Sequence, residues 1–230
     1  MPMVLGADIV VHSATKYLDG QGRVLGGAIC ANKAIIEKVL SLEPVFDLLI
    51  VDDGSPDGTA ACVKTLQQAH PDRIHLLERN GKLGLGTAYI AGFKYALEKY
   101  YEYIFEMDAD FSHNPDDLVR LYDACANQGA FMSIGSRYIN GVNVVNWPIG
   151  RVLMSYFAGF YVRFITGMPI QDATAGFVCY RRKVLETIPL DQIKFIGYAF
   201  QVEMKFTTWK YGFKMIEVPI IFTDRTKGES

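Results

Sequence analysis

Acidic side chains stand twice at the end of an apolar run that the sequence predicts to be a buried strand. FDLLIVDD ends in Asp52 and Asp53, and YEYIFEMDAD ends in Asp108 and Asp110. Ligands of open α/β sheets bind at the carboxyl ends of the strands. Carboxylates there offer hard oxygen donors to Mg2+ or Mn2+, while a substrate diphosphate fills other positions. The two acidic ends therefore predict a nucleotide and metal site, whereas a single Asp-x-Asp pair could equally cap a helix.

Basic side chains in predicted loops could bind the phosphates of such a substrate. Arg137 in GSRY, Arg151 in NWPIGR and Arg225 in TDRTKGES each stand beside Gly, Pro or Ser residues. The planar fork of arginine matches phosphate oxygens, although a surface salt bridge is the alternative for each arginine taken alone. Lys82 in RNGKLGLG would add to the same field. That glycine-rich loop lacks the GxxxxGK[ST] spacing of a P-loop.

Strands and helices alternate from about residue 46 onward, which predicts the elements that would position these groups. Apolar runs predict strands at FDLLIVDD, RIHLLER, YEYIFEM, AFMSIGSRY, GFVCYRR and KMIEVPIIF, and helical periodicity separates most of them. Such alternation predicts an α/β fold with a mostly parallel sheet and helices on both faces. An apolar helix is expected near 152–166, either packed in the core or offered to a lipid tail.

Composition excludes several classes of protein. The chain has 230 residues and a net charge of −2, so no overall basic field would attract nucleic acid. The four cysteines are far apart and form no CxxC pair, which argues against a zinc knuckle or a disulfide-stapled secreted domain. Neither a signal peptide nor a membrane-spanning segment is expected. These features predict a cytoplasmic protein, with peripheral binding to a membrane as a further option.

Seven segments in the same order resemble one family. They are LIVDDGSPDGTA, RNGKLGLGTAYIAGFKYAL, EMDADFSHNPDDL, IGSRYINGVNVVNWPIGR, QDATAGFVCYRR, GYAFQVEM and VPIIFTDRTKGES. Together they resemble the polyprenol (dolichol) phosphate mannosyltransferases, which are family-two inverting glycosyltransferases with the GT-A fold. The resemblance covers about residues 44–230. It implies metal-dependent transfer of mannose from GDP-mannose to a polyprenyl phosphate, at the cytoplasmic face of a membrane.

The resemblance also implies roles for individual residues. Asp52, Asp53, Lys82 and Asp108 would bind the nucleotide, and the metal would be held by Asp108, Asp110 and Ser112. Arg137, Arg151 and Arg225 would bind phosphates, with Asp172 of QDATAG near the reacting centre and Gln201 and Glu203 on the acceptor side. The acceptor is already an anion, so a strong general base is not required. Catalysis would rest on positioning and on neutralising the departing GDP.

The first 33 residues or so resemble a different family. LGADIVVHSATKYLDGQGRVLGGAIC resembles the segment around the Schiff-base lysine of PLP-dependent enzymes of cysteine and methionine metabolism, of the O-succinylhomoserine sulfhydrylase type, and places Lys16 at that lysine. The groups with which such enzymes hold PLP lie elsewhere in their chains and have no counterpart here. A PLP site at Lys16 is therefore not expected.

This segment stands where the mannosyltransferases have a first strand and a Pro-x-Tyr-Asn-Glu loop that contacts the nucleotide base. We therefore divide the chain into a foreign N-terminal segment, 1–43, and a GT-A-like domain, 44–230. VLGGAIC (24–30), followed by the helical ANKAIIEKVLSL, is expected to supply the missing strand. Without the loop, two alternatives stay open. One is another nucleotide sugar such as UDP-glucose, and the other is a folded but inactive chimera.

Overall fold

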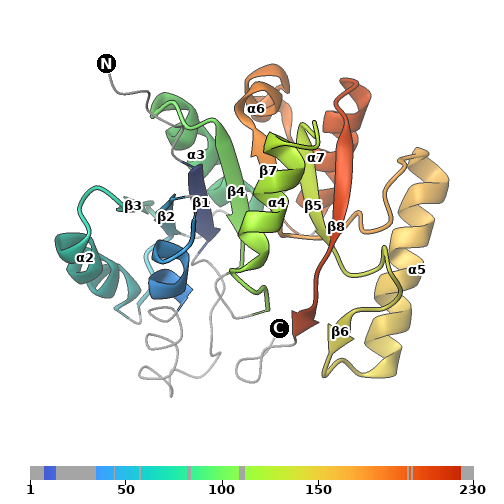
Figure 1. The fold of residues 1–230 in the computed structure, drawn as a ribbon, viewed down its shortest axis with the longest axis horizontal. Coiled ribbons are helices and arrows are strands. Elements are labelled where there is room, and N and C mark those ends of the chain that lie inside the picture. Colours follow the sequence, from blue (N-terminus) through green and yellow to red (C-terminus); the bar gives the residue numbers. More distant parts are fainter. Residues whose placement is uncertain are drawn as a thin grey trace.

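A seven-stranded sheet forms the centre of the molecule (Figure 1). The structure is a computed structural model that describes residues 8–13, 35–43, 45–56, 58–81, 84–108, 112–195, 197 and 199–223. The strand order is β3-β2-β1-β4-β7-β5-β8, and only β7 runs antiparallel to its neighbours. The strands are β1 (Asp8–Ser13), β2 (Phe46–Asp52), β3 (Ile74–Glu78), β4 (Tyr103–Met107), β5 (Met132–Ser136), β7 (Val178–Arg181) and β8 (Met215–Pro219). The predicted mostly parallel sheet is confirmed.

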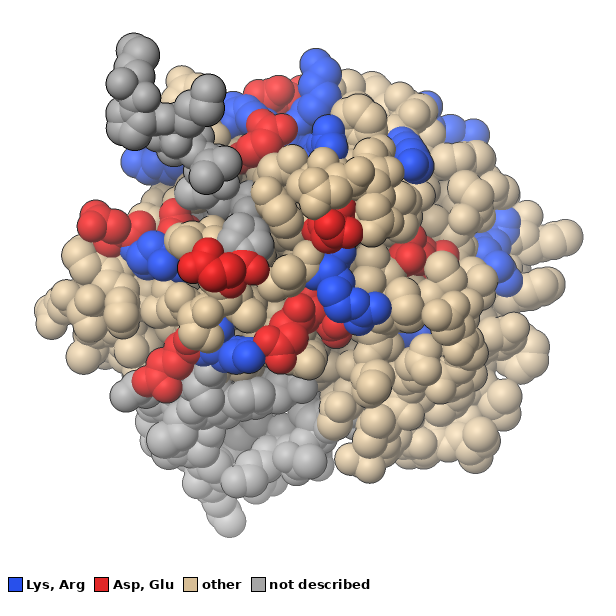
Figure 2. All heavy atoms as spheres, viewed as in Figure 1, with Lys and Arg blue, Asp and Glu red and all other residues tan. Residues whose placement is uncertain are grey.

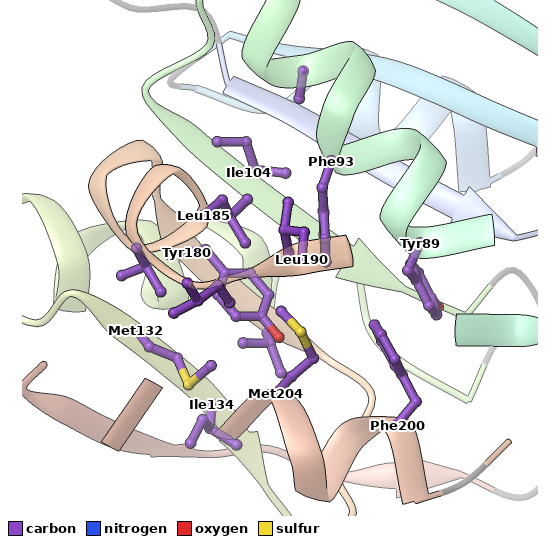
Figure 3. Packing of buried hydrophobic residues seen from close by; sticks show 14 of the residues in the cluster. Tyr89, Phe93, Ile104, Met132, Ile134, Tyr180, Leu185, Leu190, Phe200 and Met204 are labelled. Carbon is purple, nitrogen blue, oxygen red and sulfur yellow. The ribbon is translucent and has the colours of Figure 1, made fainter. Parts of the chain in front are cut away.

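Helices cover both faces of the sheet and form two hydrophobic cores. One face carries α3 (Leu85–Glu98), α6 (Arg182–Thr187) and α7 (Ala199–Lys210), and the other carries a helix over 35–40, α2 (Thr59–Ala69) and α4 (Asp117–Ala126). In the first core, Tyr89 and Phe93 of α3 pack toward Phe200 and Met204 of α7 (Figure 3).

The apolar run of β2 follows from this double cover. All seven residues of the strand are buried. Leu49 and Val51 face the core with α3 and α7, while Leu48 and Ile50 face the core with α2 and α4. Successive side chains of a strand point to opposite faces, so a strand buried on both faces is apolar along its middle. Its two charged residues stand near its ends: Asp47 is buried with Tyr101 and Arg73 as partners, and Asp52 lies at the carboxyl edge.

The strand that completes the middle of the sheet differs from our prediction. β1 is Asp8–Ser13, and it pairs in parallel with β2 on one side and with β4 on the other. The predicted strand, 24–30, lies outside the described residues. Both segments are short apolar runs, and the local pattern cannot choose between them. The expected helix after it is present at 35–40, where Ile35, Ile36 and Val39 are buried.

The helix α5 (Ile149–Thr166) stands beside the β8 edge of the sheet, next to a small parallel pair of strands (Figure 1). These strands are β6 (Val144–Val145) and β9 (Phe222–Thr223). Gly159 alone is fully buried within α5, whereas most of its large apolar side chains are exposed. The described part of the chain contains no helix that is both long and apolar enough to cross a bilayer.

Candidate active site

Four segments meet at one edge of the sheet. β2, β4 and β5 run in the same direction and end there, at Asp52, just before Asp108 and just before Arg137. Because β7 is antiparallel, it begins at the same edge, so the loop before it, 171–176, also lies there. The topology thus gathers predicted nucleotide, metal and phosphate ligands that are far apart in the sequence.

Asp52 and Asp53 have different partners at the end of β2. Asp52 Oδ2 accepts hydrogen bonds from the backbone N–H groups of Gly54 and Ser55, both at 3.2 Å. Its other oxygen, Oδ1, is buried and has no hydrogen-bond partner in the described structure. Asp53 instead forms a two-pronged ion pair with Arg79, at 2.6 and 2.7 Å. Asp52 therefore carries the carboxylate oxygen that a ligand would satisfy, and Asp53 anchors the loop.

Asp108 follows β4 and is the acidic group best placed for a cation. Tyr89 Oη lies 3.4 Å from its Oδ1, and a Cβ on Gly176 would lie 3.9 Å from its Oδ2. Ser112 is buried nearby in sequence, and its carbonyl accepts a hydrogen bond from Thr223 N–H. Asp110 lies outside the described residues. Within the described ranges, no three His, Cys, Asp or Glu side chains form a metal-binding group.

Arg137 and Asp172 form a buried ion pair. Arg137 Nε and Nη2 donate to the two carboxylate oxygens at 2.7 and 2.6 Å, and Arg137 backbone N–H donates to Oδ2 at 2.9 Å. Nη2 also donates to Thr174 Oγ1 at 2.8 Å. Burial favours the neutral acid, but these hydrogen bonds and the guanidinium charge outweigh it and hold the pKa of Asp172 below its ordinary value. Asp172 is therefore a carboxylate at neutral pH, held by three hydrogen bonds from Arg137.

The loop 171–176 is held at both ends by groups that the sequence analysis did not identify. Glu217 of β8 accepts hydrogen bonds from Gln171 N–H at 2.7 Å and from Asp172 N–H at 2.9 Å. At the other end, Lys205 Nζ donates to the carbonyl of Ala175 at 2.6 Å. Glu217 is a charged residue inside an apolar strand, and Lys205 is a charged residue on an apolar helix face. These two exceptions to the apolar pattern are the sequence feature by which both residues could have been predicted.

Aromatic rings surround the arginines of this edge. The Arg151 guanidinium lies 4.2 Å from the ring centroid of Trp147, and the Arg137 guanidinium lies 5.6 Å from the same ring. Phe222 and Tyr138 also lie within 6 Å of Arg137. Such stacking is typical of arginine and fixes the plane of its fork. The other two predicted cations, Lys82 and Arg225, lie outside the described residues, as does Lys16.

Gln201 and Glu203 of α7 make contacts within the protein. The Gln201 amide is buried, donates to Glu106 Oε2 at 3.1 Å and accepts from Lys205 at 3.1 Å. Glu203 accepts hydrogen bonds from the backbone N–H groups of Lys194 and Phe195, both at 2.9 Å. Burial raises the pKa of Glu106 to about 7 and lowers that of Lys205 to about 8. The acceptor role for Gln201 and Glu203 stays a prediction.

Comparison with known proteins identifies the family. The model of "Glycosyl transferase family 2" matches residues 33–189. A polyprenol monophosphomannose synthase of Mycolicibacterium smegmatis is 47% identical over 196 residues, which are 85% of this chain and 74% of that protein. The chain belongs to glycosyl transferase family 2. An undecaprenyl-phosphate mannosyltransferase of Micrococcus luteus is 46% identical over 187 residues, covering 81% of this family 2 chain and 76% of that protein.

Solved structures of low sequence identity share the fold. A mannosyltransferase of Pyrobaculum calidifontis, solved with GDP-Man and Mn2+, matches with a TM-score of 0.61 at 16% identity. The match covers 96% of this family 2 chain and 57% of the Pyrobaculum chain. A glucosyl-3-phosphoglycerate synthase of Mycobacterium tuberculosis, solved with Mn2+, UDP and glucosyl-3-phosphoglycerate, matches with a TM-score of 0.65 at 14% identity and covers 98% of this chain and 73% of that one. The predicted GT-A-like fold is confirmed, and the protein is a glycosyltransferase.

The start of this family 2 chain also matches a second family. The model of "Cys/Met metabolism PLP-dependent enzyme" matches residues 1–56. This agrees with the resemblance around Lys16, and it covers a minor part of the chain. The two family models overlap over 33–56, where the helix at 35–40 and β2 lie.

Proposed function

We propose that this glycosyltransferase transfers mannose from GDP-mannose to the phosphate of a polyprenyl phosphate, with inversion at the anomeric carbon. Two relatives with 46–47% identity are named for mannosyl transfer to a polyprenyl phosphate. The structural observation that carries the proposal is the meeting of Asp52, Asp108 and the Arg137–Asp172 pair at one edge of the sheet. This edge offers acids for a nucleotide and a metal next to cations for phosphates.

A divalent cation fits the Asp108 end of this edge. Mg2+ and Mn2+ accept one or two carboxylates together with substrate phosphates, and Asp108 is a partly buried residue whose carboxylate lies beside a glycine. We assign Asp108, Asp110 and Ser112 as its ligands, and Mn2+ is the ion with which two structural neighbours were solved. When bound, the ion would neutralise the charge that develops on the departing GDP.

The remaining residues of the edge would bind and orient the substrates. The Oδ1 of Asp52, which has no partner in the described structure, would accept a hydrogen bond from the nucleoside. Asp53 would hold the loop after β2, and Lys82 would add positive charge. Asp172 would fix Arg137, whose remaining donor, Nη1, would bind a phosphate oxygen together with Arg151 and Arg225. The acceptor phosphate would attack as an anion, so the protein would supply position and charge and no strong base.

The lipid part of the acceptor fits the exposed face of α5. Leu153, Phe157, Phe160, Tyr161 and Phe164 are between 48% and 76% exposed and lie three or four residues apart along the helix. In Figure 2 the right-hand side of the molecule, where α5 lies, is mostly tan, with blue atoms at its upper part and no red ones. The same helix carries Arg151, so an apolar surface continues from a predicted phosphate ligand. We therefore propose that the protein binds peripherally to the cytoplasmic face of a membrane through α5.

The N-terminal segment affects how tightly the protein would bind its nucleotide donor. We propose that residues 1–43 are a foreign segment whose strand β1 replaces the usual first strand of the 44–230 domain. Its pairing with β2 and β4 supports this replacement, because it restores the sheet beside Asp52 and Asp108. The segment brings no Pro-x-Tyr-Asn-Glu loop, so base contacts worth a few kcal/mol would be missing. Weak donor binding, or a donor other than GDP-mannose, would follow from this loss.

Calorimetric titration of the protein with GDP and with UDP, with and without Mn2+, tests the proposal. We expect Mn2+-dependent binding of GDP that is tighter than that of UDP. Asp108→Asn should abolish the metal dependence, whereas Asp116→Asn on the exposed start of α4 should not. Transfer of radiolabelled mannose from GDP-mannose to polyprenyl phosphate then tests the reaction. Binding without transfer would support the inactive chimera, and preference for UDP would support the alternative donor.

A further inference from the structure

Lys205 of α7 is a fully buried charged residue with no role in the reaction described above. Its side chain is 0% exposed. Its ammonium donates to the Ala175 carbonyl at 2.6 Å, to Gln201 Oε1 at 3.1 Å and to the Gln201 carbonyl at 3.3 Å. All three acceptors are neutral. A buried ammonium costs several kcal/mol unless it is well compensated, so its presence calls for a physical reason.

The Gln201 side chain links Lys205 to a second buried charge. Gln201 Oε1 accepts from Lys205, so its Nε2 is the group that donates to Glu106 Oε2, at 3.1 Å. The other oxygen of Glu106 accepts from Tyr180 Oη at 2.7 Å. Glu106 lies in β4, and Asp108 follows the end of that strand two residues later. The network thus runs from α7 to the strand that leads into the predicted metal ligand.

The Ala175 carbonyl links Lys205 to the active-site loop. The next residue, Gly176, lies against two groups of the site, because a Cβ on it would be 3.8 Å from Gln201 Nε2 and 3.9 Å from Asp108 Oδ2. The far end of the loop is held by Glu217 and Arg137. At the end nearest to Asp108, the side chain of Lys205 holds the Ala175 carbonyl, and the backbone N–H of Gly135 donates to the next carbonyl but one, that of Phe177, at 2.8 Å.

We propose that Lys205 is a positioning residue for the glycosyl transfer. Its ammonium is held by the Gln201 side chain and donates to the Ala175 carbonyl. It thereby fixes the Ala175–Gly176 end of the loop and sets the distance between Asp172 and Asp108. In the proposed function the donor would lie between the metal end and the arginine end of the edge, so the loop would have to be held on both sides. This inference rests on the proposed function, and its structural half stands on the contacts alone.

The simpler explanation is that Lys205 only balances the charge of Glu106. A paired variant, E106Q with K205M, separates the two roles. It removes both charges together, and the Gln201 amide can turn so that its oxygen accepts from the new amide at position 106. Nothing then donates to the Ala175 carbonyl from position 205. The single variants E106Q and K205M each leave one buried charge and serve as the comparison for stability.

Two readouts decide the question, each compared with the wild-type protein. We expect the paired variant to melt close to wild type, while backbone amide hydrogen exchange in 171–176 becomes faster. We also expect the turnover number to fall roughly 10- to 100-fold while the KM for GDP-mannose stays within about threefold, since a misplaced loop harms the transition state more than ground-state binding. Either an unchanged exchange rate or a wild-type turnover number overturns the proposal.

Two results require a further measurement: a paired variant that does not fold, and a wild-type protein that transfers no mannose. If the paired variant does not fold, E106Q with K205Q keeps a shortened N–H donor and is judged by the same two readouts, with part of the turnover expected to remain. If the wild-type protein transfers no mannose, the proposed function fails, and the exchange rate of 171–176 alone decides whether Lys205 holds the loop. Failure of the function is thereby distinguished from failure of the inference.

Discussion

Arg137 binds the carboxylate of Asp172 through both its side-chain fork and its own backbone N–H. The three bonds measure 2.6, 2.7 and 2.9 Å, and both side chains are buried. Asp172 lies 35 residues after Arg137, and the antiparallel strand β7 brings them together. The pair therefore joins the end of β5 to the loop before β7, at the edge where the substrates are proposed to bind.

Asp172→Asn should destabilise the protein strongly. The asparagine cannot balance the buried guanidinium of Arg137, and breaking a buried ion pair on one side costs about 3–5 kcal/mol. Chemical denaturation followed by circular dichroism measures this loss. Asp191→Asn is the matched control, since the side chain of Asp191 is 82% exposed in its ion pair with Lys94, and a change within about 0.5 kcal/mol is expected. Equal effects of the two variants would contradict the importance of the buried pair.

The same ion pair predicts how stability depends on pH. The folded-state pKa of Asp172 is lowered below 3.8, so its carboxylate stabilises the fold at pH values above 3.8. This stabilisation is lost as the pH falls through the folded-state pKa. Urea unfolding of the wild type and of Asp172→Asn between pH 7 and pH 2 should therefore show a constant gap down to about pH 4 that narrows below it. A gap that keeps its full size at the acid limit would show that the carboxylate charge is not responsible.

Charges on the exposed face of α5 should prevent membrane binding. Phe157 and Phe164 are 61% and 76% exposed, so Phe157→Glu with Phe164→Glu should fold normally. Two carboxylates on this face would oppose its burial at a lipid interface. Flotation with vesicles of anionic phospholipid is expected to recover the wild type and to lose this variant, with GDP affinity unchanged. Val45→Glu, at an exposed position before β2, should float like the wild type. If the α5 variant floats as well, the membrane contact lies elsewhere.

The central place of β1 predicts that its backbone is essential. Val11 pairs with Leu49 of β2 and with Glu106 of β4, so a proline here lies inside a strand with neighbours on both sides. Val11→Pro removes a ladder donor where proline is not tolerated, and we expect a loss of several kcal/mol in unfolding free energy. Val11→Ala keeps the N–H group and should be much milder. Similar stability of the two variants would mean that another segment completes the sheet.

Much of the site could be predicted from local sequence because its parts are strand ends. An apolar run that stops at an acid is a signal within eight residues, and such signals located Asp52 and Asp108 before the topology was known. The supporting residues carry no such signal. Lys205 reaches a carbonyl 30 residues earlier, Gln201 reaches Glu106 over 95 residues, and Asp172 N–H reaches Glu217 over 45 residues.

The sequence by itself determined the alternation of strands and helices, the family, and the acids and arginines at the strand ends. Each of these follows from patterns of polar and apolar residues that are close together in the chain. The tertiary structure decided which apolar segment became β1, since that choice depends on hydrogen bonds with β2 and β4 that the segment's own residues do not specify. It also decided that buried Lys205 and Glu106 lie beneath the site, because a charge in an apolar helix or strand shows its purpose only when its distant partners are in place.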